Sequence, residues 1–240
     1  MSPAPALAVI PARGGSRRIP RKNVRPFCGR PMIAWSIEAA RDSGCFERVV
    51  VSTEDAEIAE IARACGAETP FRRDPDLADD HTPTIPVIAE AARRLELAPE
   101  TPVCCVYAAA PFVRGADLAE GLSLLREREA RFVTAVATFP HPIQRALSRA
   151  EDGAVRMIDA SRMTVRSQDL EEAWHDAGQF YWARARDWTA PGAAIFDPGA
   201  YGLALPRWRV QDIDTPEDWE RAERLMRAAR AEAPAGEASA

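Results

Sequence analysis

The chain has 240 residues and a formal net charge of −5, with 47% hydrophobic and 28% charged residues. This composition can build a large core and excludes a disordered, collagen-like or coiled-coil protein. The acidic balance argues against nucleic acid or a membrane surface as a partner, and no apolar run approaches the roughly 18 residues of a membrane span.

The five cysteines show no metal-site spacing, and because their number is odd they cannot all be paired in disulfides within the chain. They are interpreted as free thiols in a reducing compartment. The N-terminal segment lacks the charged region and the long apolar stretch of a signal peptide. We therefore expect a cytoplasmic protein.

The hydrophobic patterns alternate between strands and helices. In chain order, we expect a strand at 7–10, a helix at 31–43, a strand at 49–51, a helix at 55–65 capped near Ser52 or Thr53, a short strand near 69–71, a helix at 84–97, a strand at 103–107, a helix at 117–128, and strands at 132–138 and 178–182. Such alternation predicts right-handed βαβ units, and hence an α/β fold with a mostly parallel, Rossmann-like sheet.

Residues 139–172 interrupt this alternation with prolines, charges and short apolar pieces, which predicts an excursion from the sheet as a hairpin arm. A last helix is expected after the N-cap Thr215, with Pro216 in its first turn and an acidic residue at the third position. We expect a single domain over residues 1–231. The low-complexity tail, residues 232–240, is predicted to be disordered.

A basic segment with two adjacent glycines follows the first predicted strand. Residues 13–25 contain six basic residues, and the first 30 residues contain no acidic one. In open α/β sheets, ligands bind at the carboxyl ends of strands, where the N–H groups of such a loop face phosphate oxygens. The segment matches neither the dinucleotide-binding glycine motif nor the P-loop. It predicts a nucleoside triphosphate or pyrophosphate site charged by Arg13, Arg17 and Lys22, with a solvated basic loop as the alternative.

Lys22 is the only lysine among the 31 basic residues. Because arginine serves at every other basic position, position 22 is predicted to need a compact ammonium group with three donors. Chance retention is the alternative interpretation.

Asp212 and Asp214 stand two residues apart in an apparently extended segment, so both carboxylates can face the same side. Two carboxylates together with substrate phosphates are typical of a Mg²⁺ site. The alternative is that these residues are ordinary acids near the start of the last helix.

Two further segments are rich in polar groups. The segment 72–80 mixes arginines and aspartates, and its default interpretation is a solvated loop. The segment 174–182, WHDAGQFYW, combines aromatic rings with His, Asp and Gln. It is suited to a wall that binds a sugar, and core packing of its aromatic rings is the alternative.

These segments resemble one known family. The run IPARGGSRRIPRKN is similar to the N-terminal signature of the CMP-sugar-acid synthetases, the cytidylyltransferases of sialic acid and related acids. The similarity continues through PMIAWSIEAA, RVVVSTEDAEIA, FRRDPDLADDHT and QDIDTPEDW, and it covers about residues 7–225. Within the family, HPIQRAL and RSQDLEEAWHDAGQFYW are most similar to the branch that acts on pseudaminic acid.

The resemblance implies a nucleotide-diphospho-sugar transferase fold with a small dimerisation arm, and a homodimer. It also implies a Mg²⁺-dependent reaction of CTP with pseudaminic acid that yields CMP-pseudaminic acid and diphosphate.

The resemblance assigns site residues by matching positions. The phosphate-binding signature comprises Arg13, Gly14, Gly15, Ser16, Arg17 and Lys22. Two positions match contacts to cytidine, Asn23 and Arg73, and two match metal ligands, Asp212 and Asp214. Further substrate contacts are expected at Asp80, Tyr107, Gln144, His175, Asp176 and Gln179. The residues expected to be catalytic are Arg13, Arg17, Lys22 and Asp214.

The chain departs from the sialic acid enzymes at Tyr107, where they carry a glutamine, and at His175, where they carry an arginine for the sugar carboxylate. That role stays open here, with Arg145 and Arg166 as candidates. Rival interpretations are a synthetase for CMP-N-acetylneuraminic or CMP-legionaminic acid and a non-catalytic nucleotide-binding protein. A Rossmann oxidoreductase is disfavoured because its glycine motif is missing.

Overall fold

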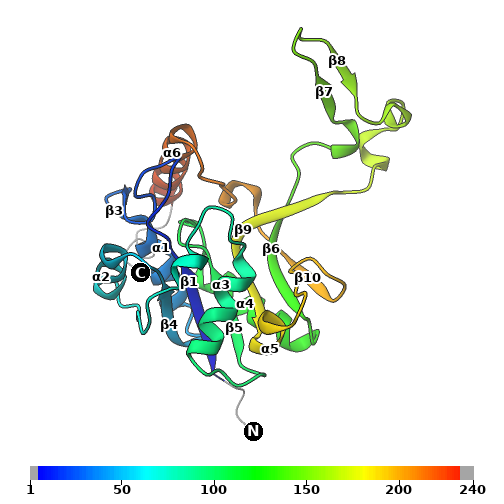
Figure 1. Ribbon diagram of the computed structural model, residues 1–240. Helices are drawn as coiled ribbons and strands as arrows, with labels where there is room; N and C mark the ends of the chain where they lie inside the picture. The colour runs from blue at the N-terminus through cyan, green and yellow to red at the C-terminus, as the bar shows by residue number, and fades with distance from the viewer. Residues whose placement is uncertain (1–4, 233–240) are drawn as a thin grey trace.

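The computed structural model describes residues 5–232, which form an α/β molecule around one large sheet (Figure 1). The sheet has the order β10-β6-β9-β5-β1-β4. Its strands are β1 (Ala6–Pro11), β4 (Phe46–Ser52), β5 (Pro102–Val106), β6 (Phe132–Thr138), β9 (Trp174–Arg184) and β10 (Ala200–Ala204). β1 is parallel to β4 and β5, and β10 is parallel to β6, whereas β9 is antiparallel to both of its neighbours. The predicted mostly parallel sheet is confirmed.

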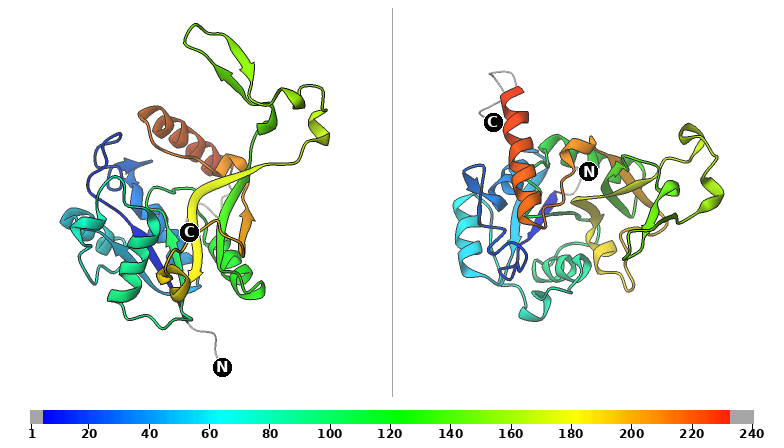
Figure 2. Two further views of the ribbon diagram at one scale, coloured as in Figure 1. Left: turned by 45° about the vertical axis from the view of Figure 1, so that its right-hand side comes forward. Right: turned by 90° about the horizontal axis from the view of Figure 1, so that it is seen from above.

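Helices cover both faces of this sheet (Figures 1 and 2). They are α1 (Met32–Asp42), α2 (Ala56–Ala64), α3 (Thr84–Arg94), α4 (Gly115–Glu127) and α5 (Ala185–Thr189). Alternate residues of β1 show the two cores, because Ala8 and Ile10 pack with α1, α2 and α4, while Leu7 and Val9 pack with α3 and α5. β1 is therefore buried on both faces, and its carboxyl end lies between those of its parallel neighbours β4 and β5.

A third apolar cluster anchors the segment that follows β1. Ile19 packs with Phe27, from the small hairpin of β2 (Pro26–Phe27) and β3 (Arg30–Pro31), and with Trp219 of α6 (Pro216–Glu232). The predicted capping box of α6 is confirmed, since Thr215 Oγ1 accepts the Asp218 N–H at 3.2 Å and Asp218 Oδ2 accepts the Thr215 N–H at 2.9 Å. The helix cap thus fixes the chain directly after Asp214.

Residues 139–173 connect β6 to β9 and extend well away from the sheet (Figures 1 and 2). They contain the hairpin of β7 (Leu147–Arg149) and β8 (Val155–Met157). Large apolar side chains of this arm are exposed: Ile143, Leu147, Val155, Ile158 and Met163.

Local predictions needed correction at three places. The expected strand at 69–71 is absent from the described chain, where a single bridge joins Glu68 to Val50. The N-cap of α2 is Asp55, whose Oδ1 accepts the Ile58 N–H at 2.9 Å, because Ser52 is buried at the end of β4. β10 and the β2–β3 hairpin were not foreseen, since each hairpin strand has only two residues, and β10 contains a glycine and a single buried side chain. In the tail expected to be disordered, residue 232 ends α6 and residues 233–240 lie outside the described chain.

None of the helices within residues 5–232 combines the length and hydrophobicity that crossing a bilayer requires.

Candidate active site

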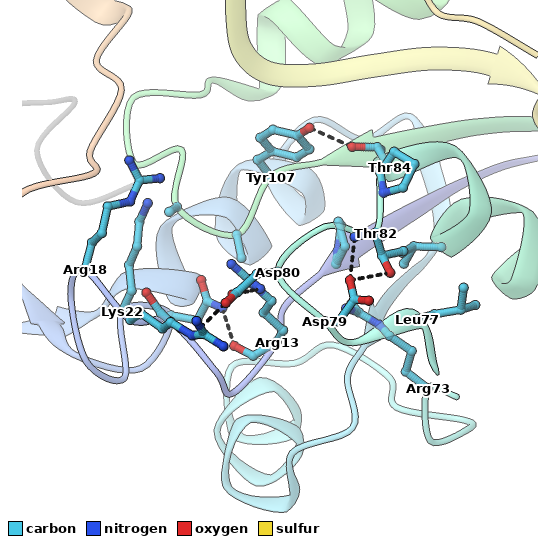
Figure 3. Close-up of a pocket in the computed structure, with 18 of the residues that line it drawn as sticks. Arg13, Arg18, Lys22, Arg73, Leu77, Asp79, Asp80, Thr82, Thr84 and Tyr107 are labelled. Carbon is cyan, nitrogen blue, oxygen red and sulfur yellow. Dashed lines mark hydrogen bonds and ion pairs between the residues drawn. The ribbon is translucent and has the colours of Figure 1, made fainter. Parts of the chain in front are cut away.

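A cavity of about 540 Å³ opens beside the segment that follows β1 (Figure 3). It lies at the carboxyl ends of β1 and β5, where α/β sheets bind their ligands. Nine of the site residues predicted from the sequence line it: Arg13, Ser16, Arg17, Lys22, Asn23, Arg73, Asp80, Tyr107 and Asp214.

Two arginines of the basic segment meet one carboxylate across the cavity. Arg13 donates to Asp80 Oδ1, and Arg17 Nε lies 2.7 Å from Asp80 Oδ2. Figure 3 shows Asp80 and Arg13 pointing toward one another from separate segments. The arginines thus converge on a position where an anion is stabilised, and in this structure the carboxylate of Asp80 supplies that negative charge.

Lys22 forms a second cationic centre with Arg18. Lys22 Nζ lies 3.3 Å from Asp214 Oδ1, and Arg18 lies 2.8 Å from Asp214 Oδ2. The Lys22 side chain is only 18% exposed, so its ammonium faces the cavity rather than bulk solvent. Sequence reasoning missed Arg18, although it stands in the same basic run.

The loop after β1 is shaped in different ways by Gly14, Gly15 and Asn23. The Gly14 N–H donates to Glu54 Oε1 at 2.6 Å, so it is not free to face a phosphate as predicted. A Cβ at Gly14 would lie 2.5 Å from Asp55 Oδ2, whereas a Cβ at Gly15 would meet nothing within 4 Å. Asn23 Nδ2 donates to the Arg13 carbonyl at 2.9 Å and thereby holds the loop across its base.

Arg73 is a buried cation at the edge of the cavity, with 4% of its surface exposed. Its guanidinium donates to the side chain and the carbonyl of Ser52 at the end of β4. Burial lowers the pKa of Arg73, and the nearby charges of Glu54 and Glu90 act in the opposite direction. The segment 72–80, whose default interpretation was a solvated loop, therefore contributes a buried charge to the site.

Asp212 does not line the cavity, but it lies close enough to Asp214 for the two charges to interact. Loss of water around its carboxyl raises the pKa of Asp212, and the charge of Asp214 raises it further. Two mutually repelling carboxylates suit a hard divalent cation. Within residues 5–232, no group of three or more His, Cys, Asp or Glu side chains could hold a metal alone.

Tyr107 lies in the cavity at the end of β5, near Thr84 of α3 (Figure 3). Their hydroxyl oxygens are 2.7 Å apart. Asp176 stands behind Tyr107 rather than in the cavity lining, and it accepts a hydrogen bond from Tyr181 at 2.5 Å. Thr84 and Tyr181 were not predicted, because Tyr181 reaches this place through the pairing of β9 with β5, and Thr84 through the packing of α3 on the sheet.

Besides Gly14, Gly15 and Asp176, three more predicted substrate contacts lie outside the cavity lining. Gln179 is buried, and its amide donates to the Arg209 carbonyl at 2.6 Å. His175 packs at 4.9 Å against Phe139 at the base of the arm. Gln144 donates to the Glu171 carbonyl at 2.9 Å within the arm.

The two arginines considered for the sugar carboxylate also lie in the arm. Arg145 donates to the carbonyl of Val165, and Arg166 pairs with Asp169 at 2.7 Å. Neither lines the cavity.

A mostly parallel sheet with a cationic cavity after its first strand defines a nucleotide-binding α/β protein whose ligand carries several negative charges. The chain belongs to the cytidylyltransferase family, whose model matches residues 7–187.

A solved structure shares the fold, and a curated relative agrees with this family. A CMP:2-keto-3-deoxy-manno-octonic acid synthetase complexed with CTP has the same fold, with a TM-score of 0.68, 20% identity, and coverage of 94% of this chain and 100% of that one. A pseudaminic acid cytidylyltransferase of Campylobacter jejuni is 42% identical over 92% of this chain and 96% of its own length. A CMP-N,N'-diacetyllegionaminic acid synthase of Legionella pneumophila is 29% identical over 92% of this chain and 95% of its own length.

Proposed function

We propose that the protein joins CTP and pseudaminic acid into CMP-pseudaminic acid and diphosphate. The observation that carries this proposal is the 42% identity, over nearly the whole of both chains, to the Campylobacter jejuni enzyme. The cationic cavity after β1 supports it, because a triphosphate is the kind of ligand that its arginines and lysine would neutralise.

The reaction is an in-line displacement at phosphorus. The anomeric hydroxyl at C2 of the sugar acid attacks the α-phosphate, the bond to the bridging oxygen of the diphosphate breaks, and the hydroxyl loses its proton. Such transfers depend on positioning and charge neutralisation more than on covalent catalysis. In this proposal Arg13 and Arg17 bind the departing diphosphate, while Lys22 stabilises the charge that develops on the α-phosphate.

Asp80 and Asp214 are the protein's own partners of these cations. Asp80 pairs with Arg13 and Arg17, and Asp214 pairs with Lys22. Binding of the triphosphate therefore exchanges carboxylate partners for phosphate partners, so the cations remain compensated before and after the nucleotide enters.

A Mg²⁺ ion is proposed as the cofactor, held by Asp212 and Asp214 together with phosphate oxygens. When bound, it would supply positive charge to the α-phosphate. Release of Asp214 from Lys22 and Arg18 frees the carboxylate for this role. The same exchange leaves Lys22 available to the nucleotide.

Arg73 and Asn23 remain the proposed cytidine contacts. Arg73 is rigid, since it is buried and bonded to Ser52, which suits recognition of a base rather than of a mobile phosphate. Tyr107 and Thr84 line the cavity away from the basic segment and are proposed to face the sugar acid, with Asp176 behind them.

The protein is also proposed to act as a cytoplasmic homodimer joined through the arm. Six large apolar side chains of the arm, Phe139 and the five named above, are exposed in the single chain, which favours their burial against a second copy. Ile158 is 71% exposed, so Ile158→Glu would place a charge in that interface. Sedimentation should show a dimer for the native protein and a monomer for the variant. A native monomer would contradict the proposal.

The activity is tested by diphosphate release from CTP, with pseudaminic, legionaminic and N-acetylneuraminic acids compared side by side, each with Mg²⁺ and with chelator. We expect turnover with pseudaminic acid alone, abolished by the chelator. Preference for another acid would overturn the sugar assignment while keeping the nucleotide chemistry. CTP binding without turnover of any acid would instead favour the non-catalytic interpretation.

A further inference from the structure

The segment that carries Asp212 and Asp214 has little regular structure. It joins β10 to α6 (Figure 1), and its helical part is the single 3-10 turn Arg207–Arg209. Within the described residues, the main chain of 211–214 makes no backbone–backbone hydrogen bond. The positions of the two carboxylates are therefore set by contacts at the two ends of this segment.

One end of the segment is held by the start of α6. Asp218 Oδ2 accepts the N–H groups of Asp214 and Thr215 at 3.3 and 2.9 Å. Ile213 is 1% exposed and packs in the apolar cluster that contains Trp219. These contacts fix the residues next to α6, and the chain must reach them from the sheet.

The other end is held by Arg209, which is 6% exposed. Its guanidinium donates one hydrogen bond to each carboxylate oxygen of Asp117, with Nη2 3.0 Å from Oδ1. Asp117 lies in the first turn of α4 and is itself buried. Because two parallel bonds fix the direction of a contact as well as its length, Arg209 is tied to α4 in one orientation.

A third side chain holds the main chain at the same place. Gln179 of β9 is 3% exposed, and its amide N–H donates to the Arg209 carbonyl at 2.6 Å. The amide oxygen of Gln179 is buried and has no hydrogen-bond partner within residues 5–232. An apolar side chain would avoid the cost of that oxygen, so the bond to the Arg209 carbonyl is what the amide contributes here.

This arrangement is better suited to fixing a position than to stabilising the fold. A buried ion pair loses about as much free energy through removal of water as it gains from attraction, whereas its bidentate geometry is specific. Mg²⁺ demands near-ideal octahedral ligation, so a small displacement of a ligating carboxylate weakens its binding. Arg209 stands three residues before Asp212 and five before Asp214, close enough along the chain to control both.

We propose that Asp117, Arg209 and Gln179 are positioning residues for Mg²⁺ binding, although none of the three lines the cavity. They act through the main chain, because α4 and β9 fix Arg209, α6 fixes the opposite end, and the segment between them presents Asp212 and Asp214. This inference rests on the metal role that the proposed function gives to these two carboxylates.

The test uses two variants that remove these contacts without leaving a buried charge unpaired. Gln179→Met removes the amide at similar side-chain length, and the double variant Asp117→Leu with Arg209→Met replaces the ion pair by apolar side chains. Each should raise the Mg²⁺ concentration for half-maximal rate about tenfold, as loss of a residue that orients metal ligands does. KM for CTP at saturating Mg²⁺ should stay within about twofold of the native value.

A second readout needs no turnover. Binding of Mn²⁺ to the protein with CTP and without the sugar acid, followed by electron paramagnetic resonance, should weaken by the same factor in both variants. Arg184→Met is the matched control. Arg184 is also a largely buried arginine, and it donates to the Ala130 carbonyl at 3.1 Å beside the start of β5, at the end of the sheet away from the cavity. The control should leave both metal readouts unchanged, whatever it does to stability.

A native Mg²⁺ dependence in either test variant would overturn the positioning role. A parallel rise in KM for CTP would show a general loss of the site and would also overturn it. Failure of the native protein to bind Mn²⁺ would remove the metal from the proposed function, and the positioning role with it. The native protein and the variants thus separate failure of the proposed function from failure of this inference.

Discussion

The two ends of the cavity are built in different ways. The cationic end comes almost entirely from one stretch, since Arg13, Arg17, Arg18 and Lys22 stand within ten residues. The hydroxyl end is assembled from separate elements, with Thr84 at the start of α3 and Tyr107 directly after β5, and the buried Tyr181 of β9 packs behind Tyr107. A contiguous site depends on the shape of one loop, whereas an assembled site depends on strand register.

The difference predicts what each end tolerates. The loop can change side chains as long as its backbone path holds, and this path is supported by Asn23, Asp55 and the cap of α6. The hydroxyl end changes as soon as the register of β9 is altered. This contrast can be sharpened by three changes at the cationic end.

The largest effect is expected from Lys22→Ala. Loss of the ammonium removes charge stabilisation from the α-phosphate, and kcat/KM should fall about 10²- to 10³-fold in the diphosphate-release assay. Lys22→Arg keeps the charge but not the compact ammonium, and it should recover only part of the rate. A rate near that of the native protein in Lys22→Ala would remove Lys22 from its proposed role.

A smaller effect is expected from Gly14→Ala, with Gly15→Ala as its matched control. A methyl group at Gly14 would approach Asp55, which cannot yield freely because it pairs with Arg21 and caps α2. The loop must shift, so KM for CTP should rise about tenfold. The free-energy cost that corresponds to a tenfold rise lies within the range measured for overpacked sites. Gly15→Ala has open space and should stay within about twofold of the native value. Equal KM values for the two variants would show that the loop path is not constrained at Gly14.

The smallest effect is expected from loss of the ion pair between Asp55 and Arg21, which supports the loop. This effect is on the stability of the fold, and it should depend on pH. The hydrogen bond from Arg21 lowers the pKa of Asp55 to about 2 from the usual 3.8. Because the folded state prefers the charged form, this group stabilises the fold above pH 3.8, and the contribution disappears as the pH falls toward 2.

Asp55→Asn removes the charge but keeps a good helix N-cap. In urea unfolding at pH 6 the variant should be about 1 kcal/mol less stable, since the pair is partly open to solvent. The difference should shrink toward zero as the pH approaches 2. A difference that stays constant over this range would mean that the pair with Arg21 contributes nothing to it.

The position of the basic segment at the carboxyl end of β1 could be predicted from the sequence for a physical reason. Basic residues and glycines that directly follow a buried strand must emerge at its carboxyl end, so their neighbourhood is fixed by chain connectivity. The same reasoning cannot find Asp80 as the partner of Arg13, because that contact spans 67 residues and depends on how the loop after β4 folds back.

The segment 174–182 shows where sequence reasoning lost information. Its aromatic and polar residues suggested one sugar-binding wall, but strand alternation divides them between two faces of the sheet. Phe180 and Trp182 are buried in the core on the side of α4. For these two rings, the alternative interpretation of core packing is therefore correct. Tyr181 points to the other face, beside Tyr107. The pairing of β9 with β6 also shifts between Tyr181 and Asp176, and such an irregularity has no reliable signal in a single sequence.

Lys22 also has a consequence for chemical labelling. It is the only lysine side chain of the protein, and it lies in the cavity beside Asp214. Reagents that acylate primary amines would therefore modify no other side chain, and bound nucleotide would shield this one. The amine chemistry that scatters labels over most protein surfaces would here mark the cavity alone among the side chains.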